Sequence, residues 1–171
     1  SLQARVALLK GLEASIFPKI IEQMDVTPGA KTLITELHQR GYKVGLVSGG
    51  FHEVIDPIAR SLGIDLVRAN RLQTFDGRLT GKVLGEIVTP ERKKDSLLTW
   101  ARENHIQRSQ TIAMGDGAND LPMIETAGIG IAFMAKPIVA ERAPYRIETR
   151  DLSLVLEILD QHRKETACIS Y

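Results

Sequence analysis

Helical and strand-like patterns alternate along this chain, and this alternation constrains the fold more than any other feature. From Thr27 to Gln161, segments with apolar residues three and four positions apart, as in helices, are separated by short apolar runs typical of strands. The run Val44–Val47 does not alternate with polar residues, as expected for a strand that is covered on both faces. The pattern predicts an α/β fold with a doubly wound, Rossmann-like parallel sheet. Between two strand patterns, Asp76-Gly77 predicts an inserted β-hairpin.

Capping residues, glycines and prolines set the boundaries of the expected elements. Two short helical stretches, Val6–Leu12 and Ile16–Met24, come first. The later helices are expected at 27–41, 51–62, 89–104, 121–127 and 152–159, and the strands at 43–47, 71–75, 78–83, 111–115, 129–133 and 145–148. From Arg163 onward the sequence predicts a frayed tail.

Charge and cysteine content exclude several classes of protein. The 171 residues carry 22 Lys and Arg against 21 Asp and Glu, a net charge of +1, so no basic field is available to hold a nucleic-acid backbone. Cys168 is the one cysteine, which excludes an internal disulfide framework and favours a reducing compartment such as the cytoplasm. The longest apolar run, 127–135, is about half of a bilayer span, so neither a transmembrane helix nor a membrane partner is expected.

Two polar loops lie where expected parallel strands end, which is where doubly wound sheets form their binding sites. In the first loop, Ser48-Gly49-Gly50, a hydroxyl is followed by two glycines whose backbone N–H groups can approach an anion. A tight turn that needs glycine for its dihedral angles explains the same residues equally well. The loop alone therefore leaves anion binding and a structural turn open.

The second loop, Gly115–Asp120, concentrates hard oxygen donors. Asp116, Asn119 and Asp120 supply two carboxylates and an amide directly after a strand, and a divalent cation such as Mg²⁺ prefers such ligands. The dipole of the next helix explains Asp120 without a metal, and a capping role explains Asn119. Neither explains an aspartate after a glycine at the end of a buried strand, so we favour a cation site at Asp116.

One lysine of the expected helix 89–104 is a further candidate. Lys93 and Lys94 both flank the apolar stripe of that helix, so either can point toward the edge of the sheet. Helical periodicity does not choose between them.

Three segments, taken in order, carry a family resemblance: Val47–Phe51, Lys93 near the start of a helix, and Gly115–Asp120. Their order and spacing are similar to three motifs of the haloacid dehalogenase superfamily of phosphatases. Segments 2–12, 69–81 and 120–123 are similar to the phosphoserine phosphatases within that superfamily. The resemblance implies a phosphatase core over 27–162, part of a helical cap over 1–26, and a tail over 163–171.

The resemblance also implies an activity and a role for each matching residue. The activity is Mg²⁺-dependent hydrolysis of phosphoserine, a small phosphorylated amino acid, to serine and phosphate through an aspartyl-phosphate intermediate, a step of serine biosynthesis. The implied roles are phosphate binding by Ser48 and the Gly49 amide, charge compensation by Lys93, Mg²⁺ binding by Asp116, substrate contact by Asn119, support of the metal and the lysine by Asp120, and recognition of the substrate carboxylate by Arg5. These groups fit phosphoryl transfer, which depends on positioning and on charge neutralisation.

One motif of the family has no counterpart in these 171 residues. The family's Asp-x-Asp-x-Thr/Val segment supplies the nucleophilic aspartate and an acid/base aspartate, and no Asp here has another Asp two positions on. We therefore expect this chain to be a C-terminal portion that lacks the nucleophile and releases no phosphate alone. In the family, that strand lies between the strands ending at Ser48 and Asp116, so both strands are expected to have exposed edges.

Two other functions fit the same residues. A non-catalytic module that keeps the phosphate and Mg²⁺ cradle, and associates with a complementing chain or with a second copy of itself, fits the exposed strand edges. A sister phosphatase for another small phosphomonoester differs in cap residues that are mostly absent from this chain, although Arg5 favours a substrate that bears a carboxylate.

Overall fold

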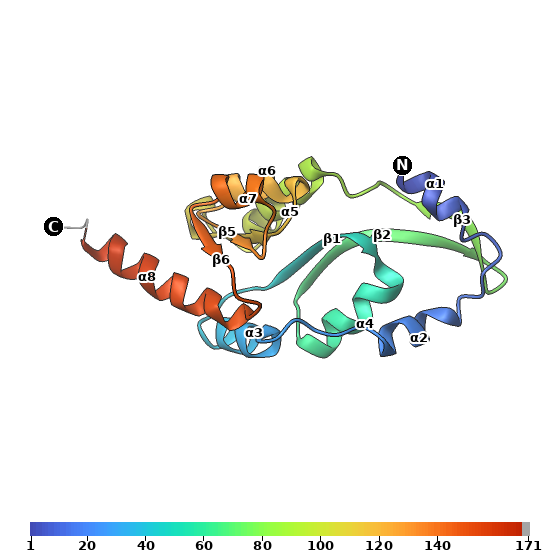
Figure 1. Cartoon of the computed structure of the whole chain (residues 1–171), viewed down its shortest axis with the longest axis horizontal. Coiled ribbons are helices and arrows are strands. Elements are labelled where there is room, and N and C mark those ends of the chain that lie inside the picture. Colours follow the sequence, from blue (N-terminus) through green and yellow to red (C-terminus); the bar gives the residue numbers. More distant parts are fainter. Residues whose placement is uncertain (169–171) are drawn as a thin grey trace. The chain divides into compact units, whose positions relative to one another are not determined.

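The computed structural model describes residues 1–168 of the chain (Figure 1). These residues form two compact units that interleave along the sequence. The first unit comprises Ser1–Asp25 and Gly41–Thr89, and the second comprises Val26–Arg40 and the chain from Pro90 onward. Each unit has its own three-stranded sheet.

The first unit joins an antiparallel hairpin to one parallel strand. Its sheet order is β1-β2-β3, with β1 parallel to β2 and β2 antiparallel to β3. Asp76 and Gly77 turn the hairpin with φ angles of 51° and 72°, the positive values that a two-residue turn of this kind requires, so the predicted hairpin is confirmed. The elements of this unit are α1 (Leu2–Ala7), α2 (Ile16–Glu22), β1 (Gly45–Phe51), α4 (His52–Leu62), β2 (Leu66–Phe75) and β3 (Arg78–Leu84).

Helix α1 packs against the hairpin of the first unit. Val6, Leu72 and Leu79 form the buried cluster between them, and Val6 is only 2% exposed. A Cβ atom on Gly81 would lie 3.3 Å from the carbonyl oxygen of Ala7, so the glycine allows β3 to approach α1 closely. The hairpin and its helix therefore form a packed support for β1, which pairs with β2.

The second unit contains a purely parallel sheet in the order β4-β5-β6. The central strand β5 is buried at four of its five positions, as expected for a parallel strand with neighbours on both sides. The elements of this unit are α3 (Ala30–Gln39), α5 (Pro90–Glu103), η1 (Arg108–Gln110), β4 (Ile112–Gly115), η2 (Ala118–Asp120), α6 (Leu121–Thr126), β5 (Ile129–Phe133), α7 (Pro137–Arg142), β6 (Tyr145–Ile147), η3 (Leu152–Leu154) and α8 (Val155–Cys168).

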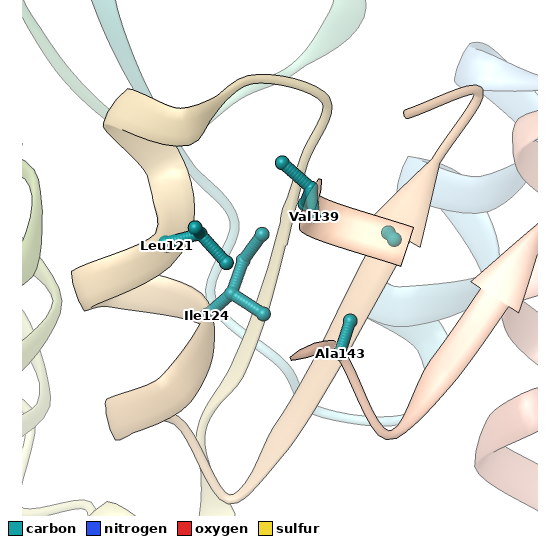
Figure 2. Close-up of a cluster of buried hydrophobic side chains, with 5 residues drawn as sticks. Leu121, Ile124, Val139 and Ala143 are labelled. Atoms are coloured by element: carbon teal, nitrogen blue, oxygen red, sulfur yellow. The ribbon is translucent and has the colours of Figure 1, made fainter. Parts of the chain in front are cut away.

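One buried apolar cluster of the second unit lies where α6, α7 and β5 meet. Figure 2 shows Leu121 and Ile124 of α6 beside Val139 of α7, and Ile124 and Val139 are 1% and 0% exposed. A Cβ atom on Gly130 of β5 would lie 2.4 Å from the carbonyl oxygen of Ile124. Only glycine lets α6 approach the strand this closely, and α6 is the helix that follows the polar loop at the end of β4.

The predicted α/β class with parallel strands is confirmed, and its strands are divided between two sheets. Within residues 1–168, β1 pairs with β2 alone and β4 pairs with β5 alone, so each lies at an edge of its sheet, as predicted for strands without a shared neighbour. No helix in this part of the chain combines the length and the apolar character that a bilayer crossing requires.

The end of β1 differs from the prediction. The segment Ser48-Gly49-Gly50, predicted as a loop, continues β1 to Phe51 because its backbone stays extended. Its pairing with β2 is nevertheless interrupted, since the register shifts between Val47 and Phe51. The polar segment is therefore an irregular strand end whose peptide groups are only partly used by the sheet.

The start of α3 also differs from the prediction. The helix begins at Ala30 rather than at Thr27, since Gly29 precedes it with a positive φ of 83°. The carbonyl group of Pro28 accepts a hydrogen bond of 2.8 Å from the N–H of Leu152, so it does not begin the helical ladder. A contact with a segment more than a hundred residues away thus overrides the local capping signal.

Two helical segments in the C-terminal half were not predicted correctly. Helix α7 was missed, although Pro137 at its first turn is a common start signal. Helix α8 continues to Cys168, beyond the predicted end of the last helix and into the predicted tail 163–171. Residues 169–171 of that tail lie outside the described residues.

Candidate functional site

The segment Ser48-Gly49-Gly50 presents a hydroxyl and an open backbone. The N–H of Gly50 donates to Ser48 Oγ at 2.9 Å, and Gly49 is exposed. Neither glycine has a positive φ, and a Cβ atom on Gly49 would meet nothing within 4 Å. The backbone therefore does not need glycine for its dihedral angles, and what glycine provides at position 49 is open space beside the peptide. This geometry favours the anion-binding interpretation over the tight turn.

Asn70 of β2 forms a side-chain hydrogen bond to the backbone of this segment. Its side-chain Nδ2 donates to the carbonyl oxygen of Gly49 at 2.9 Å, and its Oδ1 accepts from the N–H of Val88 at 2.8 Å. The residue is 1% exposed, so both amide groups of the side chain are used inside the unit. Asn70 was assigned no separate role from the sequence, although an asparagine within a strand is itself a signal, because strands disfavour it.

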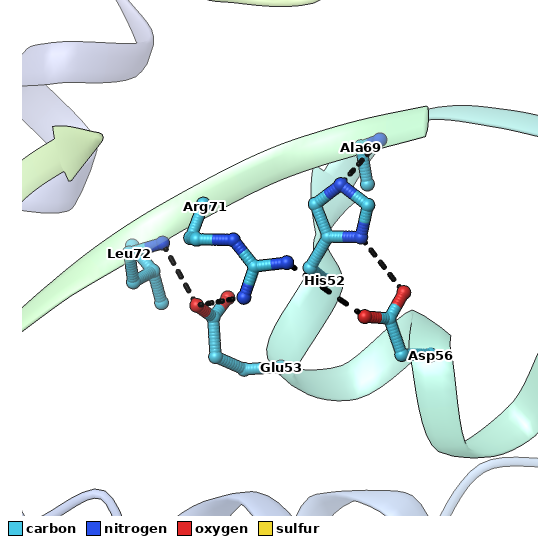
Figure 3. A network of polar contacts seen from close by, with 6 residues as sticks. All are labelled: His52, Glu53, Asp56, Ala69, Arg71 and Leu72. Carbon is cyan, nitrogen blue, oxygen red and sulfur yellow. Dashed lines mark hydrogen bonds and ion pairs between the residues drawn. The ribbon is translucent and has the colours of Figure 1, made fainter. Parts of the chain in front are cut away.

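The first turn of α4 is tied to β2 by side chains (Figure 3). His52 Nε2 accepts from the N–H of Ala69 at 3.2 Å, and Glu53 Oε1 accepts from the N–H of Leu72 at 3.1 Å. Since Nε2 of His52 is an acceptor, its Nδ1 carries the proton and donates to Asp56 Oδ1 at 2.7 Å. These contacts fix the helix that begins directly after Gly49, Gly50 and Phe51, and thereby the direction in which that segment leaves the sheet.

The loop after β4 is closed by one carboxylate. Asp120 Oδ2 accepts from the N–H of Asp116 at 3.0 Å and from the N–H of Gly117 at 3.2 Å. A Cβ atom on Gly115 would lie 2.4 Å from the Cβ of Asp120, so only glycine admits this closure. Asp116 and Asn119 are exposed, and the backbone of Asp116 is held by its hydrogen bond to Asp120.

Asp120 also forms a buried ion pair with Lys93. Lys93 Nζ lies 2.7 Å from Asp120 Oδ1, and the two residues are 7% and 6% exposed. The structure thus answers the question that periodicity left open, because Lys93 is buried and Lys94 is only half-buried. The two carboxylate oxygens of Asp120 accept from three donors: Lys93 Nζ and the N–H groups of Asp116 and Gly117. Asp120 therefore connects the lysine of α5 to the loop that carries Asp116, a larger role than complementing a helix dipole.

The predicted site residues fall into two groups. Ser48, Gly49 and Arg5 belong to the first unit, where Arg5 is an exposed residue of α1. Lys93, Asp116, Asn119 and Asp120 belong to the second unit, and there the structure brings Lys93, Asp120 and the Asp116 backbone together.

The donor set of the second group suits Mg²⁺ better than zinc. Within residues 1–168, no group of three or more His, Cys, Asp or Glu side chains is arranged to hold a metal ion. Mg²⁺ keeps several waters and commonly takes one or two protein carboxylates together with substrate phosphate oxygens. A single exposed carboxylate on a rigid loop, as at Asp116, fits that mode of binding.

The sequence is similar to those of known hydrolases. Residues 2–125 match the family model of haloacid dehalogenase-like hydrolases. The chain is 62% identical over 161 residues to a phosphoserine phosphatase of Streptococcus thermophilus, a match that covers 94% of this chain and 75% of that protein. A phosphoserine phosphatase of Lactococcus lactis is 54% identical over 161 residues, covering 94% of this chain and 74% of that protein.

Solved structures give the same result. A probable phosphoserine phosphatase from Vibrio cholerae, in its unliganded form, superposes with a TM-score of 0.91 at 39% identity over 94% of this chain and 50% of that chain. A substrate-bound phosphoserine phosphatase superposes with a TM-score of 0.86 at 44% identity over 92% of this chain and 75% of that chain. Sequence and fold agree, and the chain belongs to the haloacid dehalogenase-like hydrolase family.

Proposed function

We propose that the complete protein hydrolyses phosphoserine to serine and phosphate. In this proposal the 171-residue chain supplies the residues that bind phosphate, the lysine that compensates its charge, and the residue that binds the metal. The observation that carries the proposal is the closure of the loop after β4 by the buried Lys93–Asp120 pair, which leaves Asp116 exposed on a fixed backbone. The similar phosphoserine phosphatases, at up to 62% identity, support the choice of substrate. The single cysteine, Cys168, is consistent with our proposal that the reaction takes place in the cytoplasm.

Six residues of this chain have a proposed role. The Ser48 hydroxyl and the Gly49 N–H donate to phosphate oxygens, and Asn119 contacts the substrate. Lys93, already paired with Asp120, compensates the negative charge that phosphate brings to the site. Arg5, which is exposed, pairs with the substrate carboxylate. Asp116 holds Mg²⁺, which supplies positive charge to the phosphate oxygens when it is bound.

The nucleophile of the proposed reaction comes from outside these 171 residues. A carboxylate oxygen attacks phosphorus, and the serine oxygen leaves with a proton from the acid/base aspartate of the same motif. Water then gives a proton back to that aspartate as it hydrolyses the acyl phosphate, which releases phosphate and restores the carboxylate. Motif I, which has the form Asp-x-Asp, supplies that carboxylate in this family, and the sequence contains no such pair of aspartates. We therefore propose that this chain alone does not turn over phosphoserine.

The test compares two lengths of the protein. Phosphate release from phosphoserine is measured for the 171-residue chain and for a chain extended upstream through the first in-frame Asp-x-Asp-x-Thr/Val segment. We expect turnover only from the extended chain, abolished by a Mg²⁺ chelator and by Lys93→Ala but retained in the matched variant Lys94→Ala. Turnover by the short chain that survives repurification, or an upstream sequence without the motif, contradicts the proposal.

The one-sided pairing of β1 and β4 supports a second candidate, a binding module that associates with a complementing chain or with another copy of itself. Calorimetry with phosphate and Mg²⁺, together with light scattering for mass, tests this candidate on the 171-residue chain. A monodisperse monomer that binds neither ligand contradicts it.

The extended chain, assayed on other small phosphomonoesters, tests the sister-phosphatase alternative, for which exposed Arg5 again favours a carboxylate on the substrate.

A further inference from the structure

A single peptide group connects a buried side chain to the Ser48 hydroxyl. The peptide between Gly49 and Gly50 accepts a hydrogen bond from Asn70 Nδ2 at its carbonyl oxygen, at 2.9 Å. The N–H on the other side of the same peptide donates to Ser48 Oγ, also at 2.9 Å. Because a peptide group is planar, holding its carbonyl oxygen also sets the direction of its N–H. Asn70 thereby controls a hydrogen bond that it does not itself touch.

The direction of that N–H determines what the serine hydroxyl can do. A hydroxyl has one proton to donate and two lone pairs. In this structure one lone pair of Ser48 Oγ is occupied by the Gly50 N–H, which leaves the hydroxyl proton to donate elsewhere. Phosphate oxygens are hydrogen-bond acceptors, so this is the orientation in which a serine binds phosphate.

In the opposite orientation of the Gly49–Gly50 peptide, the Ser48 hydroxyl would no longer be free to donate to phosphate. A peptide between two glycines rotates easily, because neither residue has a Cβ atom to restrict its dihedral angles. If it turned over, the Gly49 carbonyl would face Ser48 and accept the hydroxyl proton. A Cβ atom on Gly49 would meet nothing within 4 Å, so no neighbouring side chain packs against that glycine.

Asn70 is itself held in one orientation. Its Oδ1 accepts from the N–H of Val88 at 2.8 Å, so exchanging the positions of oxygen and nitrogen would set a donor against a donor and an acceptor against the Gly49 carbonyl. At 1% exposure the side chain has no water to replace either bond. The hydrogen bonds of Nδ2 to the Gly49 carbonyl and of Oδ1 to the Val88 N–H therefore fix the orientation of the Asn70 side chain together.

We infer that Asn70 is a positioning residue that orients the Ser48 hydroxyl as a hydrogen-bond donor through the Gly49–Gly50 peptide. The use of that hydroxyl for phosphate rests on the function proposed above. Asn70 acts only through Ser48, so its contribution to phosphate binding disappears when the serine hydroxyl is removed.

A double-mutant cycle tests the inference on the 171-residue chain. Inorganic phosphate affinity in the presence of Mg²⁺ is measured by calorimetry for the wild type, Asn70→Asp, Ser48→Ala and the double variant. Asn70→Asp keeps the size and the acceptor for Val88, but an ionised carboxylate cannot donate to the Gly49 carbonyl. We expect about a tenfold loss for each single variant, and for the double variant the same tenfold loss rather than a hundredfold one.

Hydrogen exchange of the Gly50 amide gives a readout that needs no ligand. We expect the exchange to accelerate at least tenfold in Asn70→Asp and in Ser48→Ala, because each variant breaks one end of the connection. Asn104→Asp is the matched control: Asn104 Nδ2 also donates to a backbone carbonyl, that of Trp100 at 2.8 Å, and its replacement leaves Gly50 exchange and phosphate affinity unchanged. If the buried charge of Asn70→Asp unfolds the chain, Asn70→Ser, which is neutral and too short to reach Gly49, replaces it with the same expectations.

The outcomes separate this inference from the proposed function. Additive losses in the cycle, wild-type phosphate affinity in Asn70→Asp, or unchanged Gly50 exchange in that variant each overturn the inference. A wild-type chain that binds no phosphate overturns the phosphate site of the proposed function, while the exchange data still decide whether Asn70 orients the hydroxyl.

Discussion

At the scale of single residues, the two oxygens of Asp120 have different tasks. Oδ1 pairs with Lys93 Nζ at 2.7 Å, and Oδ2 accepts the N–H groups of Asp116 and Gly117. An aspartate in this position is therefore both the counter-charge of a buried lysine and the closure of a loop. Asparagine, with one oxygen and no charge, can perform only part of this.

Asp120→Asn is expected to destabilise the chain by about 3–5 kcal/mol, because it leaves the Lys93 charge buried without its partner. The free energy of unfolding from urea titration measures the effect. Asp95→Asn, the same change at an exposed position of α5, is the control and should stay within about 0.5 kcal/mol of wild type. The double variant Lys93→Met with Asp120→Asn should lose less than the sum of its single changes, since no charge is then left unpaired. A loss below about 1 kcal/mol in Asp120→Asn contradicts the assignment.

Single residues also show where sequence interpretation stops. The haloacid dehalogenase motifs located Ser48, Lys93 and Asp116, but helical periodicity did not distinguish Lys93 from Lys94, because both flank the same stripe and the partner that buries one of them is 27 positions away. Asn70 was missed for the same reason, since its two partners lie 18 and 21 positions away in the chain.

At the scale of elements, side chains of α4 replace strand-to-strand hydrogen bonds. Where β1 leaves its register with β2, His52 and Glu53 accept the N–H groups of Ala69 and Leu72. The hairpin was predictable because its signals are local, a turn at Asp76-Gly77 between two strand patterns. The first half of β2, residues 66–70, which pairs with β1, was not predicted as a strand. The continuation of β1 through Gly49 and Gly50 was not predictable from the sequence, because only tertiary contacts keep that backbone extended.

Glu53→Ala is expected to destabilise the chain by about 1–3 kcal/mol, because the Leu72 N–H loses its acceptor in a part-buried position. Glu53→Gln is the matched variant: it keeps an oxygen for Leu72 and removes only the charge that lies 3.8 Å from Arg71, whose side chain is half exposed. Urea unfolding of the two variants should therefore differ clearly, with Glu53→Gln close to wild type. Equal losses in both would show that the charge, and not the hydrogen bond, is what matters.

The contact between β6 and α8 predicts a dependence on alkaline pH. Burial, the charge of Glu165 and a hydrogen bond to Glu165 Oε2 raise the pKa of Tyr145 above its usual value of 10.0. A group with a raised pKa contributes stability below the pKa of the unfolded chain and loses it as pH rises through the folded value. The unfolding free energy should fall more steeply above pH 10 in wild type than in Tyr145→Phe, which has no proton to lose. Equal slopes for the two proteins in urea titrations above that pH would contradict this.

At the scale of the whole molecule, the chain interleaves two units, each with its own sheet and its own residues among those with proposed roles. The family relationship extends over nearly all of it, since the relatives from Streptococcus thermophilus and Lactococcus lactis both match 94% of the chain. The family motifs therefore supplied residues for the proposed roles in both units, while the division into two sheets became visible only from the pairing of β1 and β4.

A ligand that binds only the folded chain must raise its stability, which makes metal binding measurable without turnover. At about 100 times the dissociation constant, Mg²⁺ with phosphate should stabilise the chain by about 2.7 kcal/mol and raise the thermal midpoint by about 5–10 °C. Asp116→Asn should remove the Mg²⁺-dependent part of this shift, because its exposed carboxylate is the proposed ligand, while the backbone N–H that closes the loop on Asp120 is unchanged. Asp95→Asn, an exposed aspartate of the same unit, should keep the full shift. If Asp116→Asn also keeps it, the metal lies elsewhere, and the role of the loop reduces to holding Lys93.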